Sequence, residues 1–198
     1  MLSNKTFRVL SVLLAVVALL GGYSASRLLL QGDAVQTPQL GGDFTLQSNQ
    51  GPVSLADFRG QVVPIYFGYT FCPDACPTSL TYLGMAMKRL SAEQREQVQP
   101  IFVSVDPQRD TPQRLAEYVA HFGSRMLGLT GSIEQIDEVT KQYGVFYQLQ
   151  KNSEDDEFYL VDHTSRTYVM DRDGELLVPL QHGTSADDVA QALRDALR

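Results

Sequence analysis

The chain has 198 residues, with 16 basic and 23 acidic side chains and only two cysteines. This length suits one domain with a sizeable core and leaves little room for a second. All 23 acidic residues but only 14 of the 16 basic ones lie from Arg27 onward, so this part carries a formal charge of −9. Such a surface repels nucleic acid. It either attracts a cationic ligand or a basic partner patch, or simply keeps the domain soluble.

The N-terminal segment, residues 1–27, is predicted to be a membrane anchor. Lys5 and Arg8 precede an uncharged stretch of 18 residues from Val9 to Ser26. As a helix it would be about 27 Å long, nearly the thickness of a bilayer core. A cleaved signal peptide is the alternative. The positive-inside rule keeps the N-terminus in the cytoplasm, so we expect a single-pass inner-membrane protein with its domain in the periplasm or an equivalent exported, oxidising compartment.

The composition then divides the rest of the chain into a linker and a domain. The composition from Gln31 to Gly42 shifts to Gln, Gly, Asp, Thr and Pro. Residues 28–42 are therefore predicted to be a tether, and residues 43–198 are predicted to be the domain. A turn-rich stretch separates two short strand patterns at 44–46 and 52–55, which indicates an N-terminal β-hairpin. Two continuous apolar runs, Val62 to Tyr69 and Pro100 to Val105, are typical of parallel strands buried on both faces.

Helical patterns alternate with these strands. Apolar residues at helical spacing predict a helix from Pro77 to Leu90 between the two buried strands, which makes a strand–helix–strand unit. Capping signals predict further helices at 112–122, 133–143 and 186–197. A strand at 144–150, an acidic loop at 151–157 and a closing hairpin at 167–179 complete the pattern. This order of elements is that of a thioredoxin-like α/β domain with an N-terminal β-hairpin extension.

The two cysteines stand at the predicted strand-to-helix turn, in Cys72-Pro-Asp-Ala-Cys76. Four residues apart on one helix face, they suit either a reversible disulfide or a shared soft metal ion. We expect Pro73 in the first turn of the helix, where the free backbone N–H groups lower the pKa of Cys72. The carboxylate of Asp74 acts in the opposite direction.

A metal held by two thiolates needs a further ligand, and the chain has three histidines. His121 lies near a predicted helix C-terminus, where a structural role is expected. His182 lies in a loop and is expected to be solvated. His163 lies at the start of the predicted closing hairpin, in the loop that faces the cysteine turn in a thioredoxin-like topology. It is therefore either the third ligand or a loop histidine without a metal.

Four further blocks of the sequence stand out, in this order: Tyr66-Phe-Gly-Tyr-Thr-Phe-Cys-Pro-Asp-Ala-Cys-Pro77, Val103-Ser-Val-Asp-Pro-Gln-Arg-Asp-Thr-Pro112, Gly128-Leu-Thr-Gly131 and Val161-Asp-His-Thr164. Together they resemble the Sco/SenC family of copper proteins. The resemblance covers roughly residues 44–197. One departure is Phe71, where many members have histidine.

The resemblance implies a membrane-tethered domain that binds copper, as Cu(I) or Cu(II), through Cys72, Cys76 and His163. It implies Asp106 and Asp162 as residues that orient His163 or balance the charge of copper; for Asp106 the alternative is a strand-terminating Asp-Pro turn. Family members assist assembly of the binuclear copper centre of cytochrome c oxidase. The implied partners are the copper-receiving subunit and a copper donor protein.

Two redox functions compete with this copper metallochaperone, which is not an enzyme. The first is a thiol–disulfide oxidoreductase that uses a redox-active Cys72–Cys76 disulfide to reduce the cysteines of the copper-receiving subunit. The second is a thiol peroxidase, which is disfavoured because Cys72 lacks the Thr-x-x-Cys context of peroxiredoxins. An inert buried pair or a purely stabilising disulfide is the third alternative, but closing so short a loop gains little entropy.

Overall fold

The structure, a computed structural model, describes residues 17, 21, 40–153 and 156–198. Leu40–Arg198 form one unit. The predicted anchor and most of the predicted linker lie outside the described residues, as do two residues of the predicted acidic loop. Within the described residues, no helix is both long and apolar enough to cross a membrane.

The centre of the domain is a five-stranded sheet with the order β5-β4-β3-β8-β9. Its strands are β3 (Val63–Gly68), β4 (Ile101–Ser104), β5 (Leu127–Leu129), β8 (Arg166–Met170) and β9 (Leu176–Gln181). β3, β4 and β5 run parallel, whereas β8 pairs antiparallel with both β3 and β9. Every residue of β3 and β4 is buried, as the two continuous apolar runs predicted.

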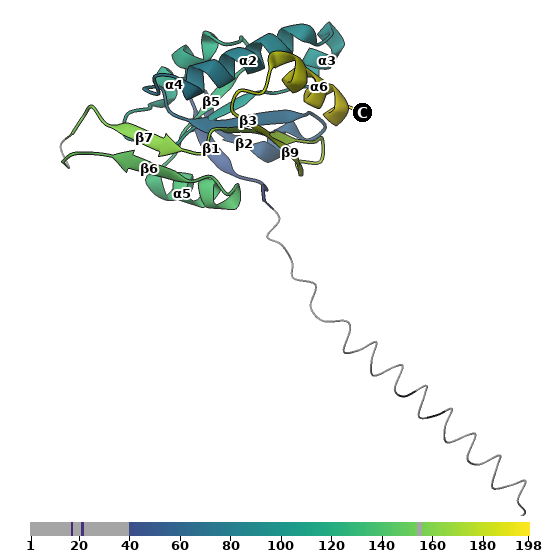
Figure 1. The fold of residues 1–198 in the computed structure, drawn as a ribbon, viewed down its shortest axis with the longest axis horizontal. Helices are drawn as coiled ribbons and strands as arrows, with labels where there is room; N and C mark the ends of the chain where they lie inside the picture. The colour runs from purple at the N-terminus through teal and green to yellow at the C-terminus, as the bar shows by residue number, and fades with distance from the viewer. Residues whose placement is uncertain (1–16, 18–20, 22–39, 154–155) are drawn as a thin grey trace, which may run out of the picture. The chain divides into compact units, whose positions relative to one another are not determined.

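Helices cover both faces of this sheet (Figure 1). α2 (Ala75–Arg89), α4 (Pro112–Ala120) and α6 (Ala186–Ala196) lie on one face, and α5 (Ile133–Gln142) lies on the other. The predicted caps are confirmed: Thr111 precedes Pro112 at the start of α4, and Ser132 and Gln135 form a capping box on α5. The thioredoxin-like architecture predicted from the order of elements is therefore observed.

Two hairpins flank the sheet. The predicted N-terminal hairpin is β1 (Thr45–Ser48) with β2 (Gly51–Ser54), followed by the short 3-10 helix η1 (Leu55–Phe58). The second hairpin, β6 (Tyr147–Gln150) with β7 (Leu160–His163), projects beside the sheet (Figure 1). Of its strands, only β6 was predicted.

The structure corrects three details of the sequence-based expectations. β7, β5 and the five-residue helix α3 (Ala92–Glu96) were not predicted. His163 ends β7 in the separate β6–β7 hairpin rather than beginning the closing hairpin, which is β8–β9. Helix α2 begins at Ala75 after the N-cap Asp74, so Pro73 lies before the helix and not in its first turn.

Candidate metal centre

The two cysteines meet because the chain turns sharply between β3 and α2. Cys72 lies before the helix and Cys76 in its first turn, so they do not share a helix face as the spacing had indicated. The Sγ of Cys72 accepts a hydrogen bond from the backbone N–H of Cys76 at 3.4 Å. The side chain of the N-cap residue Asp74 makes no hydrogen bond to the start of the helix. The sulfur of Cys72 instead accepts the bond from the Cys76 N–H, a group in the first turn that usually donates to the side-chain oxygen of an N-cap residue. Cys72 is half-buried and Cys76 is fully buried.

Gly68, at the end of β3, makes room for the second sulfur. A Cβ atom at this position would lie 2.6 Å from Cys76 Sγ and 3.0 Å from the ring of Phe102. No side chain larger than hydrogen fits there without displacing the sulfur or the ring. The last residue of the central strand therefore fixes the depth at which Cys76 is buried.

His163 faces the cysteines from the end of β7. Its Nε2 lies 3.4 Å from Cys76 Sγ, and its Nδ1 lies 3.3 Å from the carbonyl oxygen of Thr164. Because a carbonyl only accepts hydrogen bonds, we assign the ring proton to Nδ1, which leaves the Nε2 lone pair towards the sulfur. The rings of Tyr66 and Tyr69 pack edge-on against the imidazole, with centroids at 6.2 and 5.8 Å.

These three side chains form one donor set. The two sulfur atoms and the imidazole nitrogen all lie within 4.8 Å of one another. Thiolate and imidazole ligands suit Cu(I), Cu(II) and Zn(II), whereas hard ions such as Mg²⁺ and Ca²⁺ prefer oxygen. The chemistry of the residues thus fits a soft or borderline metal ion.

The two thiols have opposite pKa shifts. A hydrogen bond from Cys76, helped by the backbone N–H groups of Cys76 and Asp74, lowers the pKa of Cys72 to about 3 against the opposing effect of burial. Burial raises the pKa of Cys76, and the adjacent Cys72 raises it further. The opposite shifts make Cys72 the more acidic of the two thiols and the readier one to act as a thiolate donor.

The two acidic residues predicted to support the site make their hydrogen bonds elsewhere. Asp106 is buried; its Oδ2 pairs with Arg109 Nε at 2.5 Å, and its Oδ1 accepts a bond from the hydroxyl of Tyr159 at 2.7 Å. Asp162 lies on the outer side of β7, where its carboxylate accepts a bond from Gln150 across the hairpin. Among the described hydrogen bonds, none joins either aspartate to His163.

The other two histidines lie where the sequence indicated. His121 is the C-cap of α4, and its Nδ1 lies 2.9 Å from the carbonyl oxygen of Glu117. His182 is exposed, with its Nδ1 3.1 Å from the hydroxyl of Ser79. Neither belongs to the donor set.

Several residues around the site were not singled out from the sequence. Tyr66 and Tyr69 lie in the quoted motif around the cysteines, but nothing in their spacing marks them as the walls of the histidine site. Asp110, which is fully buried, accepts hydrogen bonds from the backbone N–H and the hydroxyl of Thr70 and from the hydroxyl of Ser104. These bonds fix the chain two residues before Cys72. The sequence around Asp110 is that of a polar loop, and it does not indicate which groups the buried carboxylate binds.

Together the fold and this donor set define a class: thioredoxin-like domains with a soft-metal site at the first strand-to-helix turn of the sheet. Residues 32–198 match the SCO1/SenC family model. The chain therefore belongs to the SCO1/SenC family.

Three relatives illustrate the similarity. The mitochondrial SCO2 homolog of Bos taurus is 43% identical over 155 residues, which are 77% of this chain and 58% of that protein. The chain thus spans less than two thirds of the length of that relative. The solved structure of copper-bound ScoI from Bradyrhizobium japonicum has a TM-score of 0.72 at 34% identity, covering 80% of this chain and 99% of that one. The structure of BsSco, described as a Sco-family cytochrome c oxidase assembly protein with a disulfide switch, has a TM-score of 0.61 at 28% identity and covers 81% and 95% of the two chains.

Proposed function

We propose that this protein is a copper metallochaperone that binds one copper ion through Cys72, Cys76 and His163 and assists assembly of the binuclear copper centre of cytochrome c oxidase. The observation that carries the proposal is the set of two sulfurs and one imidazole nitrogen within 4.8 Å of one another. The copper-bound relative at 34% identity supports the choice of copper.

Each of the three side chains contributes differently to holding the ion. Cys72 has the lowered pKa of the pair and is half-exposed, so it is the first donor that an arriving ion meets. Cys76 is buried and gives up its proton on binding. His163 presents Nε2 with the correct tautomer, because Thr164 accepts the proton on Nδ1. A half-exposed site with one buried donor suits an ion that is bound and then passed on.

The test compares the parent with His163→Ala and Cys76→Ser, all purified under reducing conditions. We expect one copper per parent chain and a thiolate-to-Cu(II) absorption band. His163→Ala should weaken binding and change the band, and Cys76→Ser should abolish stable binding. His121→Ala is the matched control, since that imidazole lies outside the donor set. An unchanged affinity and spectrum in His163→Ala would refute the three-ligand model.

A thiol–disulfide oxidoreductase that reduces the cysteines of the copper-receiving subunit is the second candidate. The specific observation in its favour is the pair of free, adjacent cysteines of unequal exposure, together with the disulfide switch described for BsSco. Thiol–disulfide exchange needs both cysteines but not the imidazole. Reduction of an oxidised recipient domain that survives in His163→Ala and is lost in Cys76→Ser would favour this activity over copper delivery.

We further propose that residues 1–27 anchor the domain in the membrane with residues 28–42 as a tether, and that the domain lies on the exported side. The support is the sequence pattern of Lys5 and Arg8 followed by 18 uncharged residues. Full-length protein should sediment with membranes and be sensitive to protease added outside spheroplasts. A chain that begins at residue 28 should be recovered without membranes.

A further inference from the structure

Arg109 lies in the loop between β4 and α4 and is almost enclosed, with 13% of its side chain exposed. Its Nε donates to the buried carboxylate of Asp106, which fixes the guanidinium at the carboxyl end of β4. Asp106 also accepts the hydroxyl proton of Tyr159. One buried ion pair therefore joins the central sheet to the segment that leads into β7.

The same guanidinium binds the backbone of the hairpin that carries His163. Its Nη1 donates to the carbonyl oxygen of Tyr159 at 2.9 Å and to that of Glu157 at 3.2 Å. Its Cζ lies 3.5 Å from the ring centroid of Tyr159. Tyr159 directly precedes β7, so these contacts fix the strand only four residues before the histidine.

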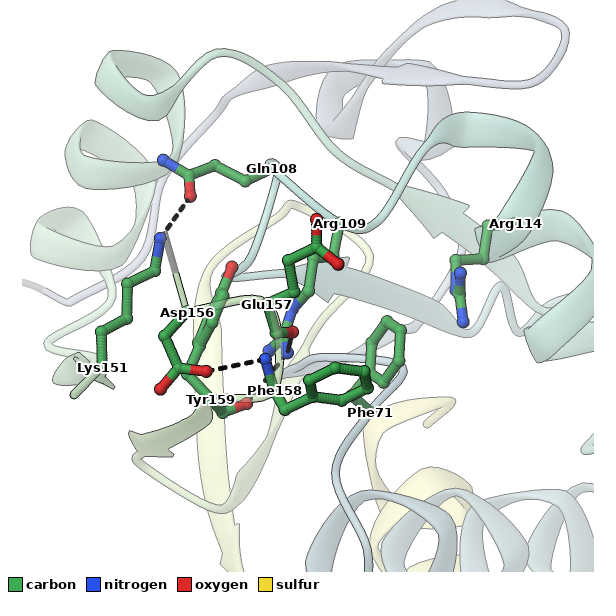
Figure 2. A pocket seen from close by; sticks show the side chains of 9 residues that line it. All are labelled: Phe71, Gln108, Arg109, Arg114, Lys151, Asp156, Glu157, Phe158 and Tyr159. Atoms are coloured by element: carbon green, nitrogen blue, oxygen red, sulfur yellow. Dashed lines mark hydrogen bonds between the residues drawn. The ribbon is translucent and has the colours of Figure 1, made fainter. Parts of the chain in front are cut away.

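On the other side the guanidinium reaches the segment that carries Cys72. Its Cζ lies 4.6 Å from the ring centroid of Phe71, the residue directly before Cys72, and 5.8 Å from that of Tyr69. Phe71, Arg109 and Tyr159 line the same open cleft (Figure 2). Its volume is about 570 Å³. The ring of Tyr69 in turn packs edge-on against His163.

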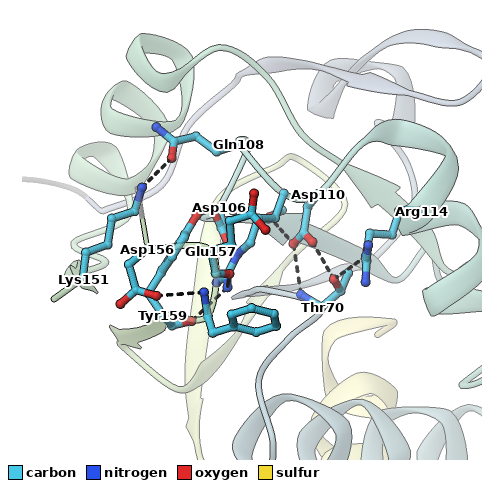
Figure 3. Close-up of polar contacts among 12 residues, drawn as sticks. Thr70, Asp106, Gln108, Asp110, Arg114, Lys151, Asp156, Glu157 and Tyr159 are labelled. Carbon is cyan, nitrogen blue, oxygen red and sulfur yellow. Dashed lines mark hydrogen bonds and ion pairs between the residues drawn. The ribbon is translucent and has the colours of Figure 1, made fainter. Parts of the chain in front are cut away.

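A second arginine holds Phe71 but does not reach the hairpin. Arg114 lies 4.3 Å from the Phe71 centroid, and its Nε donates to the hydroxyl of Thr70, which Asp110 also binds (Figure 3). Phe71 thus lies close to two guanidinium groups. Of the two arginines, only Arg109 has hydrogen bonds to the described residues that lead into β7.

From these contacts we propose that Arg109 is a positioning residue, which sets His163 at its distance from the two cysteines by tying the Phe71–Cys72 segment to the start of β7. Its hydrogen bonds and ring contacts among the described residues include none to a donor atom. The guanidinium can do this because its planar fork offers several donors in fixed directions while its faces stack on aromatic rings. A lysine ammonium is a compact charge without that fork, so it can pair with Asp106 but cannot hold the three segments together.

This inference rests on the proposed ligand set, and the experiment separates the two. Affinity for Cu(I) is measured by competition with a colorimetric chelator in the parent, Arg109→Lys, His163→Ala and the double variant. Arg109→Lys should lose roughly tenfold in affinity, the lower end of the range for residues that orient metal ligands. In the His163→Ala background the same substitution should cost less than about twofold, since no histidine remains to be positioned.

A metal-free measurement keeps the inference testable even if the ligand set is wrong. In the reduced apo protein, amide hydrogen exchange in Leu160–His163 should be faster in Arg109→Lys than in the parent, with β3 and β4 unchanged. Arg125→Lys is the matched control, because Arg125 also pairs with a carboxylate and a carbonyl, both of Glu96, and contacts none of the three donors. If Arg109→Lys does not fold, Asp106→Asn with Arg109→Met removes both buried charges and takes its place.

The possible results distinguish the role of Arg109 from the ligand set. Equal losses of affinity with and without His163, or unchanged exchange in β7, would overturn the role of Arg109. An unchanged affinity in His163→Ala alone would instead overturn the ligand set, and the exchange measurement would then decide the role of Arg109 by itself.

Discussion

The two halves of the candidate metal centre are built very differently. Cys76 is fully buried in the first turn of α2, with the central strands behind it. His163 ends a two-stranded hairpin in which each strand has four residues, and the hairpin region exposes 60% of Phe146, 90% of Phe158 and 54% of Leu160. A short two-stranded hairpin is marginally stable by itself. The cysteine half is therefore fixed by the core, whereas the histidine half depends on a few specific contacts.

The largest effect is expected on the cysteine half, from Gly68→Ala. The added methyl group would meet Cys76 Sγ at 2.6 Å, and overpacking of this kind costs about 1–3 kcal/mol of unfolding free energy. The sulfur should also be displaced, so copper affinity should fall. Denaturant unfolding and copper competition measure the two effects.

Gly123→Ala is the control for this prediction, because its Cβ meets nothing within 4 Å. It should change stability by less than about 0.5 kcal/mol. A Gly68→Ala variant as stable as Gly123→Ala would show that the core around Cys76 is looser than the geometry indicates.

On the histidine half, Thr164→Val should have a smaller and more local effect. Thr164 Oγ1 accepts the backbone N–H of Phe146 at 3.0 Å, and this bond closes the base of the β6–β7 hairpin. Loss of one such hydrogen bond costs about 1 kcal/mol. Hydrogen exchange should rise in β6 and β7 and stay unchanged in β3.

Thr184→Val serves as its control, since the hydroxyl of Thr184 bonds to the carbonyl of Gln181 in a turn after β9. That variant should leave exchange in β6 and β7 as it is. Faster exchange throughout the sheet in Thr164→Val would contradict the idea that the hairpin opens independently of the core.

The smallest differences should appear in the pH dependence of stability, with opposite signs on the two halves. Burial raises the pKa of Asp110, on the cysteine half, against the hydrogen bonds from Ser104 and Thr70. The folded protein then binds this proton more tightly than the unfolded chain, so the stabilisation is complete below the unfolded pKa of about 4 and is lost as pH rises through the folded pKa. Relative to the parent, Asp110→Asn should therefore gain stability as pH rises from about 3 to 7.

Asp156, in the loop between β6 and β7, provides the opposite case. The backbone N–H groups of Asn152 and Phe158 lower the pKa of this exposed carboxyl. Its stabilisation is present above the unfolded pKa and is lost as pH falls through the folded one, so Asp156→Asn should lose stability relative to the parent as pH rises. Urea unfolding of the parent and both variants at a series of pH values measures these differences. If the stability relative to the parent changed with pH in the same direction for both variants, this assignment would be contradicted.

The cysteine half was also the half that the sequence predicted best. Continuous apolar runs predicted β3 and β4, and capping residues predicted the starts of α4 and α5, because these signals are local. β5 has only three residues and includes a glycine, and β7 combines Leu160 and Val161 with Asp162 and His163, so neither has a strand signal of useful length. In β5, Leu127 pairs with Ile101, which lies 26 residues earlier, and in β7, His163 pairs with Tyr147, which lies 16 residues earlier. These pairings are set by tertiary structure alone.

The residues of the candidate site also divide into those predicted by local sequence signals and those that were not. The turn that holds Cys72 and Cys76 follows from the strand–helix pattern, whereas the selection of His163 depended on topology and on the family resemblance. Asp106 was expected either to orient His163 or balance the charge of copper, or to end its strand in an Asp-Pro turn; in the structure its carboxylate binds Arg109 and Tyr159. Arg109 donates to backbone carbonyl groups. Since every residue has such a group, the amino-acid sequence does not indicate which of them Arg109 binds.

The hydrogen bond from the Cys76 amide to Cys72 Sγ provides the protein with a built-in spectroscopic reporter. An N–H group bonded to a thiolate experiences a different electrostatic field once that sulfur shares its charge with a metal ion or a second sulfur. The ¹⁵N and ¹H resonances of Cys76 should therefore distinguish the reduced, oxidised and metal-loaded protein without any attached probe. A single backbone amide would then allow loading and release to be followed in real time.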